Sequence, residues 1–208
     1  MFESLRKVFS ASKGQPIAQG GGSFPVGPTG PVPLSSASLN AQLIAAATAE
    51  GGGHQTLIKE ILDYVVSENY DAALAGIDSM MRQEQLSDVR VLLIWTKSNI
   101  FQRRRQTSRE IDELVTVSAI KEHPLFELNL GIAYSRESNR KEAEVHFLRA
   151  IELMDGKYPL ATFNLGILYC DTGRSREARL RLEDLESGKE KVPSQLIQKL
   201  KDRVSSMR

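Results

Sequence analysis

The stretch that decides the fold runs from Pro124 to Gly156 and reads PLFELNLGIAYSRESNRKEAEVHFLRAIELMDG. The next stretch, from Pro159 to Gly188, reads PLATFNLGILYCDTGRSREARLRLEDLESG and repeats much of the first at a constant offset of 35 residues. Similarity within one chain at a fixed period of about 20–50 residues is typical of stacked repeats rather than of a single globular core. The sequence therefore predicts a solenoid.

Each repeat is predicted to hold two antiparallel helices joined by a short turn. Pro124 and Pro159 stand where a first helix would begin, because proline is tolerated in the first helical turn. The segments SRESNR and DTGRSR provide the turn, and Gly156 and Gly188 end the second helix. The two clear repeats are predicted at residues 124–156 and 159–188.

The residues that the two repeats share resemble the tetratricopeptide repeat, a family whose pattern runs Leu-Gly, Tyr, Ala, Phe, Ala at these spacings. Here the pattern is carried by Leu130, Gly131, Tyr134, Ala143, Phe147 and Ala150, and again by Leu165, Gly166, Tyr169 and Ala178. Small Gly131 and Ala143 would let the two helices approach closely, while Tyr134 and Phe147 fill the space beside them. The departures are Glu127 and Thr162 where the family often has Trp, Leu182 and Leu185 at later positions, and Asp155 where it often has Pro.

We therefore expect an all-α fold, a tetratricopeptide-like superhelix of antiparallel helix pairs with a C-terminal capping helix. Two degenerate repeats are predicted upstream, with Ala73 at the position of Ala143, Ile77 at that of Phe147, and Trp95 at the family's aromatic position. A final helix with apolar residues at helical spacing and charges opposite would cover the exposed end. The predicted ranges are 54–208 for the whole repeat domain, about 54–87 and 89–120 for the degenerate repeats, and about 193–207 for the cap.

Residues 1–53 are predicted to form a flexible arm. They hold nine of the 15 glycines and five of the eight prolines, and such a tract buries too little apolar surface to offset the cost of ordering its backbone. Two short helical stretches interrupt it, at residues 2–9 and 38–50. Residues 2–9 would give at most a peripheral membrane contact, or would dock in the groove of the solenoid itself or in another protein.

Charge, cysteine content and the length of apolar runs predict the cellular compartment of the protein. The formal net charge of +1 gives no overall attraction to nucleic acid or anionic lipid. The one cysteine, Cys170, excludes an intrachain disulfide, which fits a reducing compartment. The N-terminal stretch has no apolar core of signal-peptide length, and no apolar run approaches the roughly 20 residues that span a bilayer. We expect a cytoplasmic protein.

The sequence gives no pattern that indicates catalysis. His54, His123 and His146 are scattered, without a metal-ligand spacing to Cys, Asp or Glu. Cys170 has no evident activating base beside it, and the chain has neither a phosphate-binding loop nor a dinucleotide fingerprint. We expect no enzyme, no metal and no cofactor.

A second apolar stripe on the first helices points to a partner-binding groove. The resemblance implies that first helices line a concave surface, and an exposed apolar stripe there would suit an amphipathic helix or an extended peptide. The alternative is that the neighbouring repeat covers the stripe. Its residues are Leu125, Leu128, Ile132, Leu160, Phe163 and Ile167.

Asn129 and Asn164 recur one repeat apart along the same groove. The resemblance implies that an asparagine before Leu-Gly bonds the backbone of a bound peptide, and a carboxamide both donates and accepts. The alternative is a local hydrogen bond. Lys59 and Lys97 are predicted at the equivalent upstream positions, with Arg136 as a further cation, so the groove would accept an acidic partner. The family's carboxylate-clamp subset needs more basic residues than these.

The run FQRRRQTSR holds four arginines that could contact nucleic acid: Arg103, Arg104, Arg105 and Arg109. The run lies between two predicted helices without interleaved aromatics, which favours a solvated turn or a contact with an acidic partner.

These observations together predict a non-enzymatic interaction module, that is, an adaptor, scaffold or assembly chaperone. Its partner would be a peptide or helix of another protein. The alternatives are a structural repeat protein that assembles into a homo-oligomer and, less favoured, an RNA-binding helical repeat that uses Arg103–Arg105.

Overall fold

The structure is a computed structural model that describes residues 39–45, 55–83, 87–187 and 192–207. Within these ranges every regular element is a helix. The described residues before His123 form one compact unit, unit 1, and those from His123 onward form another, unit 2. The predictions for residues 1–38 and 46–54, including the apolar face at residues 2–9, lie outside the described residues.

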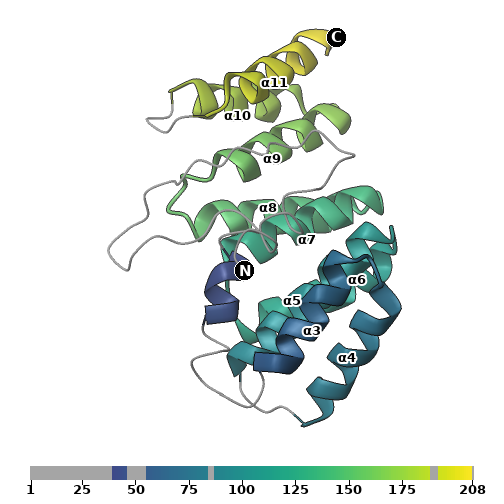
Figure 1. The fold of residues 1–208 in the computed structure, drawn as a ribbon. Coiled ribbons are helices and arrows are strands. Elements are labelled where there is room, and N and C mark those ends of the chain that lie inside the picture. The colour runs from purple at the N-terminus through teal and green to yellow at the C-terminus, as the bar shows by residue number, and fades with distance from the viewer. Residues whose placement is uncertain (1–38, 46–54, 84–86, 188–191, 208) are drawn as a thin grey trace. The chain divides into compact units, whose positions relative to one another are not determined.

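Unit 1 begins with a short helix at residues 39–45, within the stretch 38–50 that the sequence predicts as helical. Four longer helices follow, α3 (Gln55–Val66), α4 (Tyr70–Gln83), α5 (Ser87–Arg103) and α6 (Thr107–Ile120). Each packs against the next along the chain (Figure 1). Buried aliphatic side chains from all four helices form the core, among them Ile58, Ile77, Leu92 and Leu114.

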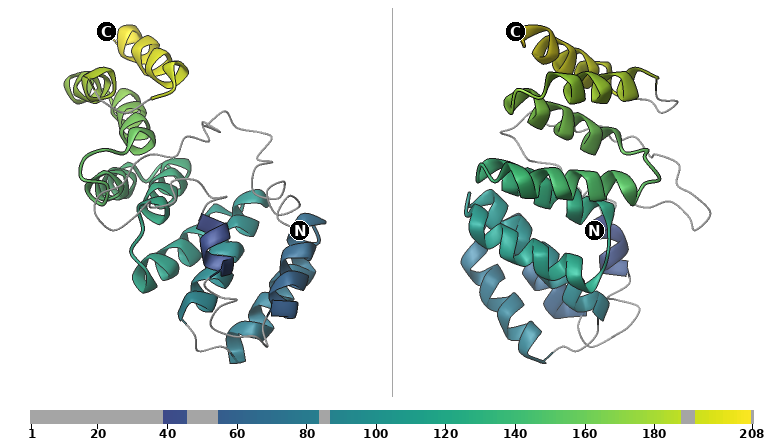
Figure 2. Two further views of the ribbon diagram at one scale, coloured as in Figure 1. Left: turned by 60° about the vertical axis from the view of Figure 1, so that its left-hand side comes forward. Right: turned by 180° about the vertical axis from the view of Figure 1, so that it is seen from behind.

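Unit 2 holds five helices of 13 residues each. They are α7 (Pro124–Arg136), α8 (Arg140–Glu152), α9 (Pro159–Asp171), α10 (Ser175–Ser187) and α11 (Ser194–Ser206). Successive helices pack together, and α9 also contacts α7 and α11, so the first helices of successive pairs are neighbours (Figures 1 and 2). This all-α arrangement is compatible with a helical solenoid.

Proline sets the start of the first helices as the sequence predicts. Pro124 and Pro159 occupy the first turn of α7 and α9. At α7 the preceding residue, His123, accepts a hydrogen bond at Nδ1 from the Leu125 backbone N–H at 3.1 Å. That bond satisfies one donor that the helix start leaves without an intrahelical partner. At α11, Pro193 is the cap residue and the helix begins one residue later.

One backbone turn recurs in all four helix pairs. A residue with positive φ, the left-handed conformation common after helices, stands at Glu68 (φ 59°), Arg105 (57°), Ser138 (59°) and Gly173 (74°). The N–H of the following residue donates to an aromatic residue's carbonyl: Asn69 to Tyr64, Gln106 to Phe101, Asn139 to Tyr134, and Arg174 to Tyr169, at 2.9–3.0 Å. The turns therefore define equivalent positions without reference to side-chain identity.

Close approach of the two helices depends on Gly131, as the sequence predicts. A Cβ at Gly131 would lie 2.4 Å from Cδ1 and 2.5 Å from Cε1 of the Phe147 ring. The equivalent positions hold Ser98 with Leu114 in the second pair and Ile61 with Ile77 in the first. Between Gly131 with Phe147 and Ser98 with Leu114, a larger residue on the first helix accompanies a smaller one on the second. Ile61 with Ile77 and Gly166 with Leu182 do not follow this exchange.

The backbone also accounts for one departure from the tetratricopeptide pattern. Asp155, where that family often has Pro, has a φ of 50°, and Gly156 after it has a φ of 80°. Proline is restricted to a φ near −65°, so it cannot adopt this conformation. The chain leaves α8 by a left-handed turn that excludes proline.

Candidate functional site

The turns fix which residues are equivalent to Asn129 and Asn164 on the first helices. Each asparagine lies nine residues before the positive-φ residue of its turn (129 and 138; 164 and 173), and the same spacing gives Lys59 on α3 and Thr96 on α5. The prediction that Lys97 holds this position is wrong by one residue. Lys97 lies 32 residues before Asn129, whereas the turns at Arg105 and Ser138 are 33 residues apart.

The same shift moves Trp95. It is equivalent to Leu128 and Phe163, ten residues before the turn, and not to the family's aromatic position, which Ile94 occupies instead. Trp95 is therefore on the first-helix stripe that the sequence predicts as groove-lining, and it is 1% exposed.

Three of the equivalent polar side chains bond their own helix in the same way. Each donates to the carbonyl four residues earlier at 2.7 Å: Thr96 Oγ1 to Leu92, Asn129 Nδ2 to Leu125, and Asn164 Nδ2 to Leu160. The local bond that the sequence left as an alternative thus exists. A carboxamide has two N–H donors and one acceptor oxygen, and the described residues give neither asparagine side chain a further bond. One N–H and Oδ1 of each half-buried asparagine therefore make no hydrogen bond to the described residues.

Lys97 instead joins three helices inside unit 1. Its Nζ lies 3.1 Å from Asp78 Oδ1 on α4 and 3.0 Å from Glu113 Oε1 on α6. Burial alone would lower the pKa of Lys97, but hydrogen bonds and attraction from the two carboxylates raise it above its usual value. Lys97 is therefore an internal ion-pair residue, whereas Lys59 on α3 is exposed.

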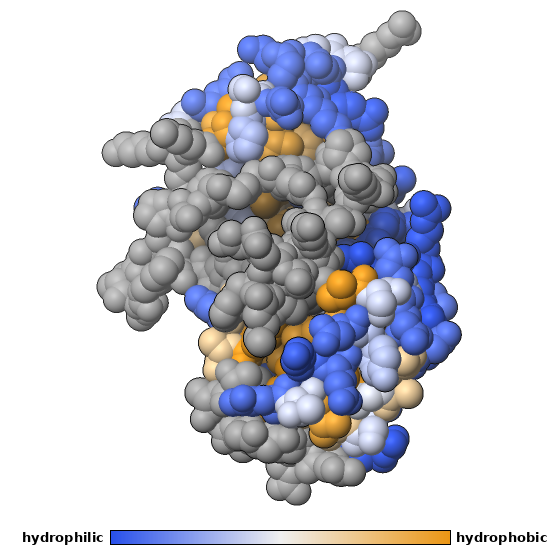
Figure 3. Space-filling model, in the orientation of Figure 1, coloured by the Kyte–Doolittle hydropathy of each residue, from blue (hydrophilic) through white to orange (hydrophobic). Residues whose placement is uncertain are grey.

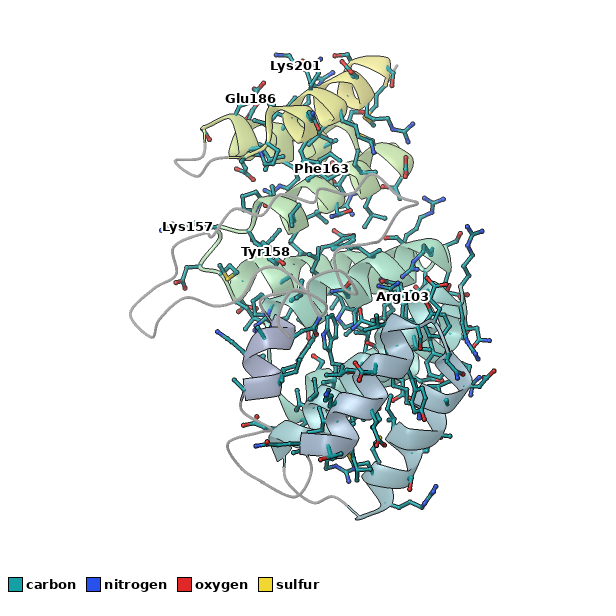
Figure 4. The ribbon with its side chains drawn as sticks, in the orientation of Figure 1. Arg103, Lys157, Tyr158, Phe163, Glu186 and Lys201 are labelled. Carbon is teal, nitrogen blue, oxygen red and sulfur yellow. The ribbon has the colours of Figure 1, made fainter. Side chains whose placement is uncertain are left out.

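The apolar stripe is more covered than a free binding surface would be. Leu125, Leu128 and Phe163 are buried at 4%, 4% and 2% exposure, and Ile132, Leu160 and Ile167 are half-buried. The expectation of an exposed stripe is therefore wrong for the first three. For Phe163, which is labelled in Figure 4, the cover includes α11, because the Nζ of Lys199 on that helix lies 5.8 Å from the ring centroid. The asparagines of this face are half-buried to the same class as Ile132, Leu160 and Ile167, so its accessible part is both polar and apolar.

Helix α11 continues the pattern of first helices for one more step. Leu200 lies 35 residues after Leu165 and is 0% exposed, like Leu165 itself. A Cβ at Gly166 would lie 2.7 Å from Leu200 Cδ2, so α11 packs directly on α9. The residue before it, Lys199, is then equivalent to Asn164. We call Asn129, Asn164 and exposed Lys199 the polar column of unit 2.

Charges beside the column are mostly neutralised within unit 2. Arg203 on α11 pairs with the Asp171 carboxylate on α9, and Arg140 donates to the Asp171 backbone carbonyl at 3.3 Å. Burial, with a contribution from Asp171, raises the pKa of the neighbouring Cys170 thiol, although Arg203 opposes the shift. Cys170 is thus a packed thiol. Arg136, the extra cation expected from the sequence, is exposed at the end of α7.

Glu127, which stands where the resembled family often has Trp, is buried with a polar partner. Its Oε2 lies 2.7 Å from Nδ1 of His146 on α8, and the His146 ring stacks on Tyr134 with centroids 5.3 Å apart. A buried carboxylate needs such a partner, because an unpaired one would be strongly destabilising. His146 is accordingly a packing residue between α7 and α8.

The arginine run forms the turn between α5 and α6, and two of its guanidinium groups are used within unit 1. Arg104 pairs with Asp71 at 2.7 Å. Arg109 stacks over the Phe101 ring at 4.5 Å. Arg105 is exposed at the turn itself, and Arg103 is half-buried (Figure 4). The run thus lies at the turn between two helices, where the sequence places it; the contact with an acidic partner stays a prediction.

No protein-family model matches the chain, and neither a curated protein nor a solved structure is significantly similar to it. Among the described residues no group of three or more His, Cys, Asp or Glu side chains is placed to hold a metal ion. In the same part of the chain, no helix combines the length and the apolar character needed to cross a bilayer.

Sequence reasoning missed Lys199 and Thr96 as members of the recurring position. Lys199 was within reach, because the offset of 35 residues that links Asn129 to Asn164 also links Asn164 to Lys199. Thr96 was not, because no residue from Gln102 to Gln106 is of a type that marks Arg105 as the left-handed residue of the turn.

Proposed function

We propose that the chain is a tetratricopeptide-like, non-enzymatic interaction module that holds a peptide or helix of another protein along α7, α9 and α11. The observation that carries this proposal is the polar column. Two asparagines at one helical position present an N–H and a carbonyl oxygen each, and that pair of groups matches the amide unit of a peptide backbone. The recurring turn and the close approach of α7 and α8 at Gly131 support the tetratricopeptide assignment.

Lys199 gives the proposed partner its charge preference. Its ammonium group is exposed at one end of the column, next to the Phe163 ring. A carboxylate near one end of the bound peptide would pair with this group, and such an exposed pair contributes less than about 1 kcal/mol and weakens with salt. The role of adaptor, scaffold or assembly chaperone follows by analogy of fold and depends on the partner.

The test uses crosslinking capture from native cell extract with the full chain, followed by affinity measurement with the captured partner's purified segment. In the variant Asn129→Ala/Asn164→Ala two amide contacts are lost at about 1 kcal/mol each, so the affinity should fall roughly 30-fold. Leu128 and Phe163 are unsuitable targets, because charged residues at these buried positions would disrupt the fold.

Asn99→Ala is the matched control. The Asn99 Nδ2 donates to the carbonyl of Trp95 at 2.7 Å, the same own-helix bond, but Asn99 lies on α5 outside the column. Equal losses of affinity in the two variants, or no loss in either, would contradict the proposal. Lys199→Glu should weaken binding most at low salt.

A second candidate is self-assembly, favoured by an exposed apolar patch on the second helices of unit 2. Val145 and Leu148 on α8 are 57% and 43% exposed, and Leu180 on α10, one repeat after Val145, is 44% exposed. Exposed apolar side chains at equivalent positions suit an interface between copies. Sedimentation velocity would test it: a wild-type oligomer that Val145→Lys/Leu180→Lys makes monomeric supports self-assembly.

A further inference from the structure

The short helix at residues 39–45 is amphipathic, and its apolar face is buried. Leu39 and Leu43 are 2% and 1% exposed, and Asn40 beside them is 3% exposed, whereas Ala41 and Gln42 on the other face are exposed. Residues four apart lie on one side of a helix, so the two leucines and Asn40 form a single contact face. The helix is therefore docked by this face.

Its docking site includes Trp95 on α5. The indole Nε1 of Trp95 donates to Asn40 Oδ1 at 2.6 Å, and both groups are buried in unit 1. A buried indole N–H needs a hydrogen-bond acceptor, because a buried donor without a hydrogen bond destabilises the folded state. Trp95 is equivalent to Leu128 and Phe163 on the first-helix face. A segment of the chain itself thus occupies this face of α5.

We propose that the Trp95 face of α5 is a second binding site, for a short amphipathic helix that presents two leucines four residues apart and an asparagine after the first. Residues 39–45 are its occupant in cis, and a helix of the same chemistry on a partner protein competes with them. The leucines supply burial, and the asparagine oxygen supplies the acceptor that Trp95 requires.

Two features make the cis helix displaceable. Asn40 Nδ2 is buried without a hydrogen-bond partner, which costs stability in the docked state. A helix this short is also marginal on its own, so it depends on docking for its order. Against this, the covalent connection through residues 46–54 keeps the cis helix at an effective concentration on the order of mM. A partner helix that satisfies more of its own polar groups overcomes that advantage.

This site belongs to unit 1 and does not depend on the polar column of unit 2, so the two proposals fail separately. It also has its own optical reporter. Trp95 is the single tryptophan of the chain, so the tryptophan fluorescence of the full-length protein reports on the surroundings of this one indole.

The experiment measures acrylamide quenching of Trp95 in the full chain. Leu39→Asp/Leu43→Asp should release the helix, shift the emission to longer wavelength and raise the quenching constant severalfold. A synthetic peptide of residues 35–50 added in trans should reverse both changes with a saturable titration. The same peptide with both leucines changed to aspartate should have no effect.

Ala41→Asp/Gln42→Asp is the matched control variant, since it adds the same charge to the exposed face of the same helix. It should leave the emission and the quenching unchanged. Unchanged quenching in the leucine variant with helical circular dichroism intact would overturn the proposal, as would failure of the peptide to protect Trp95. A wild-type dimer that becomes monomeric only in the leucine variant would overturn it too, because the occupant would then come from a second copy.

A milder variant decides the matter if the double aspartate chain loses its helical signal. Leu43→Ala removes most of one buried leucine, which should weaken cis docking roughly 10- to 30-fold. Labelled peptide 35–50, followed by anisotropy, should then bind this variant about that much more tightly than it binds the wild type. Equal affinities for the two proteins would overturn the proposal.

Discussion

Replacing Gly131 by Ala tests how tightly α7 and α8 are packed. The added methyl group would lie 2.4–2.5 Å from two atoms of the Phe147 ring and 3.0 Å from a third. Phe147 is 1% exposed, so the ring has little free space to move into. Overpacking of this kind typically costs about 1–3 kcal/mol. Alanine gains about 1 kcal/mol over glycine in a helix, so the net loss of unfolding free energy should be about 0–2 kcal/mol.

Gly76 on α4 provides the matched control. A Cβ there would meet the Ile61 side chain, with the nearest atom, Cγ1, at 2.9 Å. Only this one atom of Ile61, which is itself 4% exposed, comes so close, whereas two atoms of the Phe147 ring lie within 2.5 Å of the Cβ at Gly131. The gain in helix propensity should therefore offset most of the contact, and Gly76→Ala should stay within about 0.5 kcal/mol of neutral.

The assay is urea unfolding followed by far-UV circular dichroism, with the midpoint and slope fitted for each variant. A double variant, Gly131→Ser/Phe147→Leu, copies the Ser98 and Leu114 pair of unit 1. It should be less destabilised than the sum of its two single substitutions, because the smaller side chain makes room for the larger one. Stabilisation of the chain by Gly131→Ala of about 1 kcal/mol would refute the argument, since it would show that the ring is free to move.

Three further substitutions test other contacts. Tyr158→Phe should stabilise unit 2 by about 1 kcal/mol in thermal unfolding, because the 1% exposed hydroxyl has no hydrogen-bond partner among the described residues. Burial and a hydrogen bond to Glu144 raise the pKa of Tyr169 to about 12. The contribution of protonated Tyr169 to the free energy of unfolding is therefore complete below pH 10 and should be lost as the pH rises from about 10 to 12. Glu144→Ala should lower that pKa in an absorbance titration at alkaline pH. Asp155→Pro should destabilise the chain by about 3 kcal/mol, because the φ of 50° is closed to proline; an unchanged melting temperature would contradict this.

The helix pairs of unit 2 could be predicted from the sequence because their small and aromatic residues recur at a constant offset. Pro124 and Pro159 begin the helices where the pattern places them, and Gly131 faces Phe147 as expected. These features depend on local backbone rules and on contacts within one pair. Such contacts repeat whenever the residues repeat.

The register of unit 1 could not be predicted in the same way. Helix α5 runs for 17 residues and its turn uses Arg105, a residue type that gives no hint of a positive φ. The error moved Trp95 and Lys97 by one position, which on a helix is a rotation of about 100° and exchanges a groove residue for an internal one.

The burial of the apolar stripe could not be predicted from the sequence for a different reason. Which side chains cover Phe163 depends on how α11 packs across α9, and that is a tertiary contact without a sequence period of its own. The hydrogen bond between Trp95 and Asn40 joins residues 55 positions apart, and no sequence motif predicts it.

The shared turn has a consequence for how such a chain can change its length. The turn has the same backbone conformation whether its left-handed residue is Glu68, Arg105, Ser138 or Gly173. The conformation of the turn therefore does not depend on the residue type at this position. Deleting one repeat between two turns, for example by connecting Ser138 directly to Arg174, would leave the helices on either side joined by a turn of the same conformation as before. Duplication or deletion of a DNA segment that encodes one repeat can therefore lengthen or shorten the protein without requiring a new type of turn.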